Sequence, residues 1–372
     1  MSTKRVISEK DEKKIAFAFE NATRLLATQK QRAERMELTL LRGDTPTFME
    51  FPLATKPEHL TGLDAAILGI PFEGITAMSP MISAQPICGK PPKDSVYWRM
   101  GADEGLDMIR KYSLYYSINH NGGYFPEIHK DMLMTEVIKV KDYGDVPYTA
   151  DDIEGNIDRA EQRVADIVAA GAVPIVLGGD HTVPTPILKA VLKPRTKKVG
   201  LIVFDSHMDL SHEPKNWAST EWSQALELGK ISPDNFAIIG IRGVRNNIFE
   251  KNVAKELGHH VYTIDVIKDR GMRAVMDEVI QKVTDGTDGV YCSIDIDVME
   301  PSAVPSQKAP EIWGFTIDEM FVALRKLTRE KIVGADINEY TADYDINGMG
   351  AQFCARVAAE FLAGIALRKY KG

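Results

Sequence analysis

Cysteine is scarce in this chain, and its positions exclude the roles for which cysteines are usually clustered. Three cysteines, Cys88, Cys292 and Cys354, occur among 372 residues. Their odd number and wide separation give neither a disulfide framework nor a CxxC zinc site. Because unpaired thiols are typical of a reducing compartment, we expect the protein to be cytoplasmic.

We find no signal-peptide pattern, no long apolar run and no excess of basic residues in this sequence. Its first residues, MSTKRVISEKDEKK, are charged and have no apolar core. No run approaches the ~18 consecutive apolar residues of a membrane span. With 45 Lys and Arg against 53 Asp and Glu, the formal net charge is -8. This balance argues against nucleic acid and membrane as partners and suits a small cationic substrate.

No internal repeat, low-complexity segment or linker divides the chain, and 44% of its residues are hydrophobic. Residues 1–45 are charged, with Leu and Met at helical spacing, and predict an N-terminal helical extension that packs on the core or on a neighbouring subunit. Residues 46–372 alternate short apolar strands with amphipathic helices, which predicts one catalytic domain of the α/β class.

Residues 78–98 show neither strand nor helix periodicity. A loop of this length inside a compact domain is usually functional or disordered, and its hydrophobic content argues against disorder. We expect it to form either a lid or a contact between subunits.

Polar side chains follow the apolar strand LIVF at residues 201–204. Asp205, His207 and Asp209 stand within five residues, where the strand should end. The carboxyl ends of parallel strands are where α/β sheets bind ligands. Two carboxylates and an imidazole are costly to bury unless all three are paired, and a divalent cation can pair with them all. A polar turn after a core strand is the alternative.

A second strand, VPIVL at residues 173–177, precedes Gly178, Gly179 and His181. The glycines would let the backbone bend and approach a ligand closely, with His181 delivered at the edge of the sheet. Taken alone, a histidine such as His181 is more often structural than a ligand. Because the next strand follows after a single helix, the two strands form a βαβ unit, and both end in side chains that can bind a metal.

Acidic residues end two further strands. Asp295 and Asp297 are two apart in VYCSIDIDVMEP (290–301), so in a strand they would project to the same face. Without a cation between them they would repel each other. Glu339 ends the last predicted strand, KIVGADINEY (331–340).

These residues exceed what one tetrahedral zinc would use. They fit two divalent ions ~3.5 Å apart that share carboxylates, an arrangement that lowers the pKa of a bridging water. The six candidate metal ligands are His181, Asp205, His207, Asp209, Asp295 and Asp297.

Three of these segments, GGDHT (178–182), DSHMD (205–209) and DIDVMEP (295–301), resemble in order the signatures of the ureohydrolase family, which includes arginase, agmatinase and guanidinobutyrase. The resemblance runs from about Asp64 to the C-terminus. It implies an arginase-like fold, a three-layer α/β/α arrangement with a central mostly parallel sheet. It also implies a hydrolase acting on C–N bonds of linear amidines, assembled as a trimer or hexamer of one or two kinds of subunit.

The resemblance further implies roles for single residues. Two ions, Mn2+ or Ni2+, would be bridged by Asp205 and Asp295 and would ready a hydroxide to attack a guanidinium carbon, so that urea and an amine leave. Glu339 would grip the guanidinium, since a carboxylate accepts two of its N–H donors in a fork. The remaining ligands would be divided between the ions: His181 and Asp209 on one, His207 and Asp297 on the other.

Two loops depart from the family pattern. VPSQKAPEIWGFT (304–316) replaces a loop like GTGTPEPGG, and HEPKNWASTEW (212–222) lacks the usual His-Gly pair. Either His212 substitutes for the missing histidine as a catalytic proton carrier, or water protonates the leaving group. Trp217, Trp222 and Trp313 could form a substrate-binding aromatic box, which favours a cation with methyl groups, although each could also be a packing residue.

We therefore expect a small or N-alkylated guanidine or biguanide as substrate, as in a guanidine- or metformin-hydrolase branch, ahead of arginine. An agmatinase or guanidinobutyrase is one alternative. A second is a non-catalytic or regulatory subunit of a hetero-oligomer, against which the intact ligand set argues, because unmetalled carboxylates are a burden to the fold. A third is a formiminoglutamase-like or deacetylase-like hydrolase, against which Glu339 argues, because it suits a cation.

Overall fold

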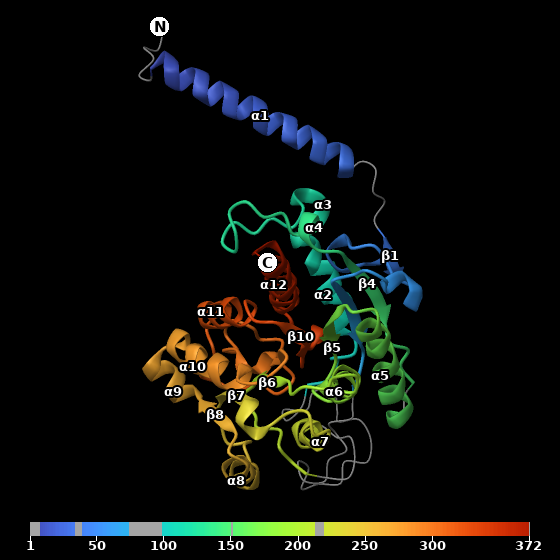
Figure 1. Ribbon diagram of the computed structural model, residues 1–372, viewed down its shortest axis with the longest axis vertical. Coiled ribbons are helices and arrows are strands. Elements are labelled where there is room, and N and C mark those ends of the chain that lie inside the picture. The colour runs from blue at the N-terminus through green and yellow to red at the C-terminus, as the bar shows by residue number, and fades with distance from the viewer. Residues whose placement is uncertain (1–7, 34–38, 74–98, 150–151, 213–218, 372) are drawn as a thin grey trace.

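A parallel sheet of eight strands forms the centre of the protein (Figure 1). The computed structural model describes residues 8–33, 39–73, 99–149, 152–212 and 219–371. The loop expected at residues 78–98 and Trp217 lie outside these residues. In spatial order the strands are β4 (Val140–Asp145), β3 (Ala65–Ile70), β5 (Val173–Gly178), β10 (Ile332–Asn338), β9 (Val290–Asp295), β6 (Gly200–Phe204), β7 (Phe236–Ile241) and β8 (His260–Thr263).

The strand order places the candidate site. The strands that precede His181, Glu339, the Asp295 segment and the Asp205 segment are β5, β10, β9 and β6, and these four are consecutive neighbours in the middle of the sheet. Because all pairings are parallel, their carboxyl ends lie at one edge. Residues far apart in the chain are therefore brought together by strand order alone.

Helices cover both faces of the sheet, which is the three-layer arrangement expected from the sequence. One face packs against α2 (Gly105–Ser113), α9 (Ile264–Arg270), α10 (Met272–Thr284), α11 (Ile317–Leu327) and α12 (Met349–Lys371). The other packs against α5 (Ile153–Ala169), α6 (Pro184–Leu192), α7 (Glu221–Glu227) and α8 (Ile248–Leu257). Outside these layers are the short helices α3 (Ile118–Asn121) and α4 (Met134–Val137) and the two-stranded ribbon of β1 (Leu40–Arg42) and β2 (Thr45–Pro46).

The central strands are apolar on both sides because both faces are covered. In β6, Leu201 and Val203 belong to the core under α5–α8, whereas Ile202 and Phe204 belong to the core under α10–α12. The same alternation explains why these strands read as continuous hydrophobic runs.

The C-terminal helix α12 is long and apolar enough to cross a membrane by length and composition. However, 78% of its most apolar window is buried inside the protein, as in the core helix of a folded domain. Its many alanines let it lie close to β10 and α2.

Helix α1 (Glu9–Ala33) projects from the body of the protein (Figure 1). Its Phe17 and Phe19 side chains are largely exposed. A helix was expected in residues 1–45, and the assignment of that segment as an extension separate from a catalytic domain at 46–372 stays a prediction.

One predicted strand is shorter than expected. The strand predicted through Asp297 ends at Asp295, and Ile296–Val298 form a 3₁₀ turn. The expectation that Asp295 and Asp297 share a strand face is therefore wrong, because the Asp295 side chain accepts the Asp297 N–H and bends the chain.

Candidate metal centre

The carboxyl ends of β6 and β9 turn in the same way. Asp205 Oδ1 accepts the His207 N–H at 2.6 Å, and Asp295 Oδ1 accepts the Asp297 N–H at 2.7 Å. An aspartate that accepts from the backbone two residues on forms an Asx turn. The turn fixes each carboxylate and leaves its Oδ2 atom facing His181. The His181 Nδ1 atom is 3.2 Å from Asp205 Oδ2 and 3.3 Å from Asp295 Oδ2.

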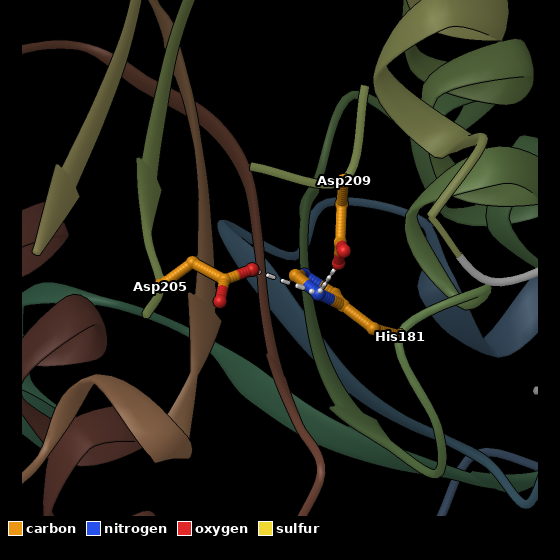
Figure 2. A group of neighbouring side chains, drawn as sticks. All are labelled: His181, Asp205 and Asp209. Atoms are coloured by element: carbon orange, nitrogen blue, oxygen red, sulfur yellow. Dashed lines mark hydrogen bonds and ion pairs between the residues drawn. The ribbon is translucent and has the colours of Figure 1, made fainter. Parts of the chain in front are cut away.

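His181 lies at the centre of one group of oxygens. Its Nδ1 is also 3.0 Å from Asp209 Oδ2 (Figure 2). On the other side of the ring, Nε2 is 3.2 Å from Ser293 Oγ, which donates to Asp336 Oδ1 at 2.7 Å. A histidine that uses one nitrogen in such a chain presents the other, in a fixed orientation, to a metal.

His207 forms the second group. Its Nδ1 is 3.0 Å from Asp297 Oδ2 and 3.6 Å from Asp205 Oδ1. Asp205 therefore directs one oxygen to each histidine, which is the placement of a bridging carboxylate. The His207 and Asp209 side chains are the most exposed of the six, at 14% and 13%, so the cluster opens on their side.

The glycines before His181 lie close against neighbouring chain segments. A Cβ atom at Gly179 would overlap the backbone of Phe72, and one at Gly178 would overlap Asn338. They therefore allow close approach of neighbouring chain segments, and the expectation that they also allow close approach of a ligand stays a prediction.

The cluster is electrostatically unbalanced without a cation. Burial, together with the charges of Asp297 and Asp209, raises the pKa of Asp205 to about 7. Burial lowers the pKa of His207, but the carboxylates of Asp297 and Asp205 outweigh it and raise that pKa to about 10. Asp205 Oδ2 and Asp297 Oδ2 are buried without a hydrogen-bond partner.

These observations fit divalent metal ions. His181, Asp205 and Asp209 place one ligand atom each within 4.8 Å of one another, and so do Asp205, His207 and Asp297. Imidazole and carboxylate donors that share one aspartate are the ligand set of a two-ion centre. Asp295 lies beside the first group through its contact with His181.

Glu339 lies directly beside this centre. It follows β10 with a left-handed backbone (φ 66°), and its Oε1 accepts the His181 N–H at 2.7 Å. Burial raises the pKa of Glu339 to about 8, although the nearby Lys308 ammonium opposes the increase. Asp209 is also left-handed (φ 46°). Non-glycine residues held in this region store backbone strain, which is concentrated at functional sites.

Comparison with known proteins identifies the family. Residues 63–364 match the arginase family. The chain belongs to the arginase family. It is 28% identical over 326 residues to a guanidinopropionase of Pseudomonas aeruginosa, covering 86% of this chain and 92% of that one.

Solved structures of the family share the fold. The proclavaminate amidinohydrolase of Streptomyces clavuligerus is 25% identical, with a TM-score of 0.73 over 89% of this chain and 100% of that one. A formiminoglutamase of Trypanosoma cruzi solved with Mn2+ has a TM-score of 0.69 at 20% identity, covering 87% of this chain and 100% of that one. The predicted family, its arginase-like fold and its enzyme class, hydrolysis of C–N bonds in linear amidines, are confirmed. The family is binuclear and Mn-dependent.

Lys308 is a functional candidate that the sequence reading missed. It is in the loop that departs from the family pattern, and its side chain is 1% exposed. Its Nζ donates to Glu73 Oε1 at 2.7 Å and lies 3.9 Å from Asp180, while its N–H donates to the Glu339 carbonyl at 2.9 Å. The presence of a lysine in the substituted loop was the signal in the sequence that could have indicated this role. Residue spacing does not show that the lysine side chain is buried.

Of the four residues expected in the substrate loops, the structure describes Trp222, Trp313 and His212, and it does not bring them together. Trp222 has no exposed surface and packs edge-on against the His181 ring at 5.4 Å, so it supports a candidate ligand and does not line an open aromatic box. Trp313 is 56% exposed. The His212 side chain is 73% exposed and lies 3.7 Å from Glu227, so the expected proton carrier is a surface residue in this structure.

Proposed function

We propose that the chain binds two divalent ions and hydrolyses a C–N bond of a small or N-alkylated guanidine or biguanide. Guanidine would yield urea and ammonia, an alkylguanidine urea and an amine, and a biguanide guanylurea and an amine. The observation that carries the proposal is the convergence of six metal-binding side chains at the ends of β5, β6 and β9 with Glu339 beside them.

The proposed ligands divide into two sets that share two aspartates. Asp205 and Asp295 would belong to both sets, since each lies against His181 and accepts the N–H of the residue two positions on, which belongs to the second group. When bound, such ions polarise water for attack on an electrophilic carbon. The first ion would be held by His181, Asp205, Asp209 and Asp295, and the second by Asp205, His207, Asp295 and Asp297.

Glu339 would recognise the substrate. Its carboxylate is held in place by the His181 N–H and is almost fully buried. A guanidinium ion donates two parallel N–H groups to a carboxylate, and its charge favours the ionised form of a group whose pKa is otherwise raised. Glu339 thus orients the planar cation with its carbon toward the metal centre.

The leaving amine would take its proton from water. His212 is at the surface beside Glu227, and His181 and His207, the histidines of the cluster, are proposed ligands. This supports the alternative in which no side chain replaces the missing family histidine.

A small substrate is supported by the surroundings of Glu339. The loop that carries Lys308 pairs with the chain after β10, and the buried Lys308–Glu73 ion pair fills space close to the substrate-binding carboxylate. The cluster itself is exposed mainly through His207 and Asp209. Both features favour guanidine and short N-alkyl derivatives over guanidino acids and agmatine.

The test is a release assay for urea and guanylurea over a panel of guanidine, methylated guanidines, dimethylbiguanide, agmatine, 4-guanidinobutyrate and arginine, with Mn2+-loaded and Ni2+-loaded protein in parallel. We expect turnover of the small or N-alkylated compounds to dominate and Glu339→Gln to abolish it. Turnover concentrated on agmatine or 4-guanidinobutyrate would replace the proposal with the agmatinase or guanidinobutyrase reading. No turnover of any compound by protein that holds both ions would favour the non-catalytic subunit.

An oligomeric assembly and a cytoplasmic location belong to the same proposal. Light scattering after size exclusion should give the mass of a trimer or hexamer of this 41.3 kDa chain, and a monomer would contradict it.

A further inference from the structure

Glu221, the first residue of α7, is a buried carboxylate without a role in the mechanism above. Its side chain has no exposed surface, and neither Oε1 nor Oε2 has a hydrogen-bond partner. Buried polar groups in folded proteins are almost always paired, and an ionised carboxylate is the most costly to leave unpaired. A partner supplied from outside the polypeptide is therefore expected.

The position of Glu221 identifies that partner. Its Oε1 is 3.7 Å from His181 Nδ1, the nitrogen that also faces Asp209, Asp205 and Asp295 at 3.0, 3.2 and 3.3 Å. Atoms bonded to one divalent ion at ~2.1 Å lie roughly 3.0 to 4.2 Å apart. Each of the four oxygens is therefore at a distance from His181 Nδ1 that two ligands of one ion can have.

The charges around Glu221 favour the same partner. Among the residues that the structure describes, the basic group within ion-pair distance is the His181 imidazole. A histidine must be neutral to bind a metal through that nitrogen, so it cannot balance Glu221 in the loaded protein.

The residue next to Glu221 packs against His181. The neighbouring Trp222 is fully buried, and its ring packs edge-on against the His181 ring. The start of α7 is therefore fixed relative to His181, which is what an accurately placed ligand requires.

We propose that Glu221 is a fifth protein ligand of the ion held by His181, Asp205, Asp209 and Asp295. The inference rests on the metal centre proposed above. It gives this ion four carboxylates and one imidazole, an oxygen-rich set that suits Mn2+. Its carboxylate would reach the ion from the α7 side of the sheet.

The first experiment measures Mn2+ binding to the full-length chain after chelator treatment, by elemental analysis and by the electron paramagnetic resonance signal of free Mn2+. The proteins are wild type, Glu221→Gln and the control Glu250→Gln. Glu250 is also buried and lies in the field of Asp209, but it accepts hydrogen bonds from Ser211 and Asn247. Gln can keep its place in the capping box of α8.

We expect wild type and Glu250→Gln to hold two ions per chain with affinities within about threefold of each other, whereas Glu221→Gln should bind one ion roughly 10- to 100-fold more weakly. Metal-free Glu221→Gln should melt no lower than metal-free wild type, because the carboxylate it replaces accepts no hydrogen bond within the polypeptide. Unchanged Mn2+ affinity in Glu221→Gln, or an equal loss in Glu250→Gln, would overturn the assignment. Wild type that holds fewer than two ions would overturn the proposed metal centre itself.

A second measurement does not depend on any variant folding. The measurement is a crystal structure of the Mn2+-loaded wild type in which anomalous scattering locates the ions. A Glu221 oxygen within about 2.6 Å of the His181-bound ion supports the assignment. A Glu221 carboxylate more than 3.5 Å from both ions, or bound only to substrate, refutes it while leaving the two-ion centre intact.

Discussion

Substitution of Lys308 by methionine tests the buried ion pair beside Glu339. The Lys308 and Glu73 side chains are 1% and 2% exposed, and their charged atoms are 2.7 Å apart. Removal of one partner leaves an uncompensated buried charge, which typically costs about 3–5 kcal/mol of folding free energy. Methionine keeps the length and apolar stem of lysine, so little of this loss should come from a cavity.

The size of the effect can be converted to a melting temperature. Unfolding entropies near 2.1 cal/mol/K per residue give roughly 0.8 kcal/mol per degree for a chain of this length. Lys308→Met should therefore lower the melting temperature by about 4–6 °C in circular dichroism melts. The double variant Lys308→Met, Glu73→Gln should recover more than half of that decrease, because the new glutamine side chain stays neutral and can still accept the Gly101 and Ala102 N–H groups that Glu73 accepts now.

Two results would refute the role of the Lys308–Glu73 ion pair. A Lys308→Met protein that melts within 1 °C of wild type, on the scale of ~0.8 kcal/mol per degree, would show that the pair contributes little. Losses that add in the double variant would show that the two residues do not act as a pair.

Three further predictions concern the metal-free and metal-binding states. Burial raises the pKa of Glu339 to about 8, so the folded metal-free protein binds this proton more tightly than the unfolded chain does. Wild type therefore loses stability relative to Glu339→Gln as the pH rises from about 4.5 to 8. A difference in melting temperature that does not change with pH would contradict this. Addition of Mn2+ at pH 7 should release at least one proton per chain, because His207, with a pKa of about 10, must be deprotonated to bind; calorimetric heats that do not depend on the buffer would contradict it. Ser293→Ala should weaken Mn2+ binding roughly 10-fold or more, since Ser293 links His181 to Asp336; an unchanged affinity would mean that packing alone orients the ring.

The sequence by itself determined the family, the fold class and the candidate ligands. Each of the three motifs follows an apolar run. The spacing of the candidate ligands within a motif is a local property, so it does not depend on how the rest of the chain folds. Where local chemistry competed with a periodic pattern, the sequence reading failed: Asp297 is in a 3₁₀ turn and not in a strand, because the Asp295 side chain captures its N–H.

Only the tertiary structure decided how the residues outside the motifs contribute. Strand order made β5, β10, β9 and β6 neighbours, although they are far apart in the chain. Burial distinguished Trp222, which supports His181, from the exposed Trp313, and it turned Lys308 and Glu221 from ordinary loop and helix residues into charges that need partners. The physical reason is that desolvation, which sets the cost of a charge, depends on which segments pack around it, and no local pattern in the sequence records that packing.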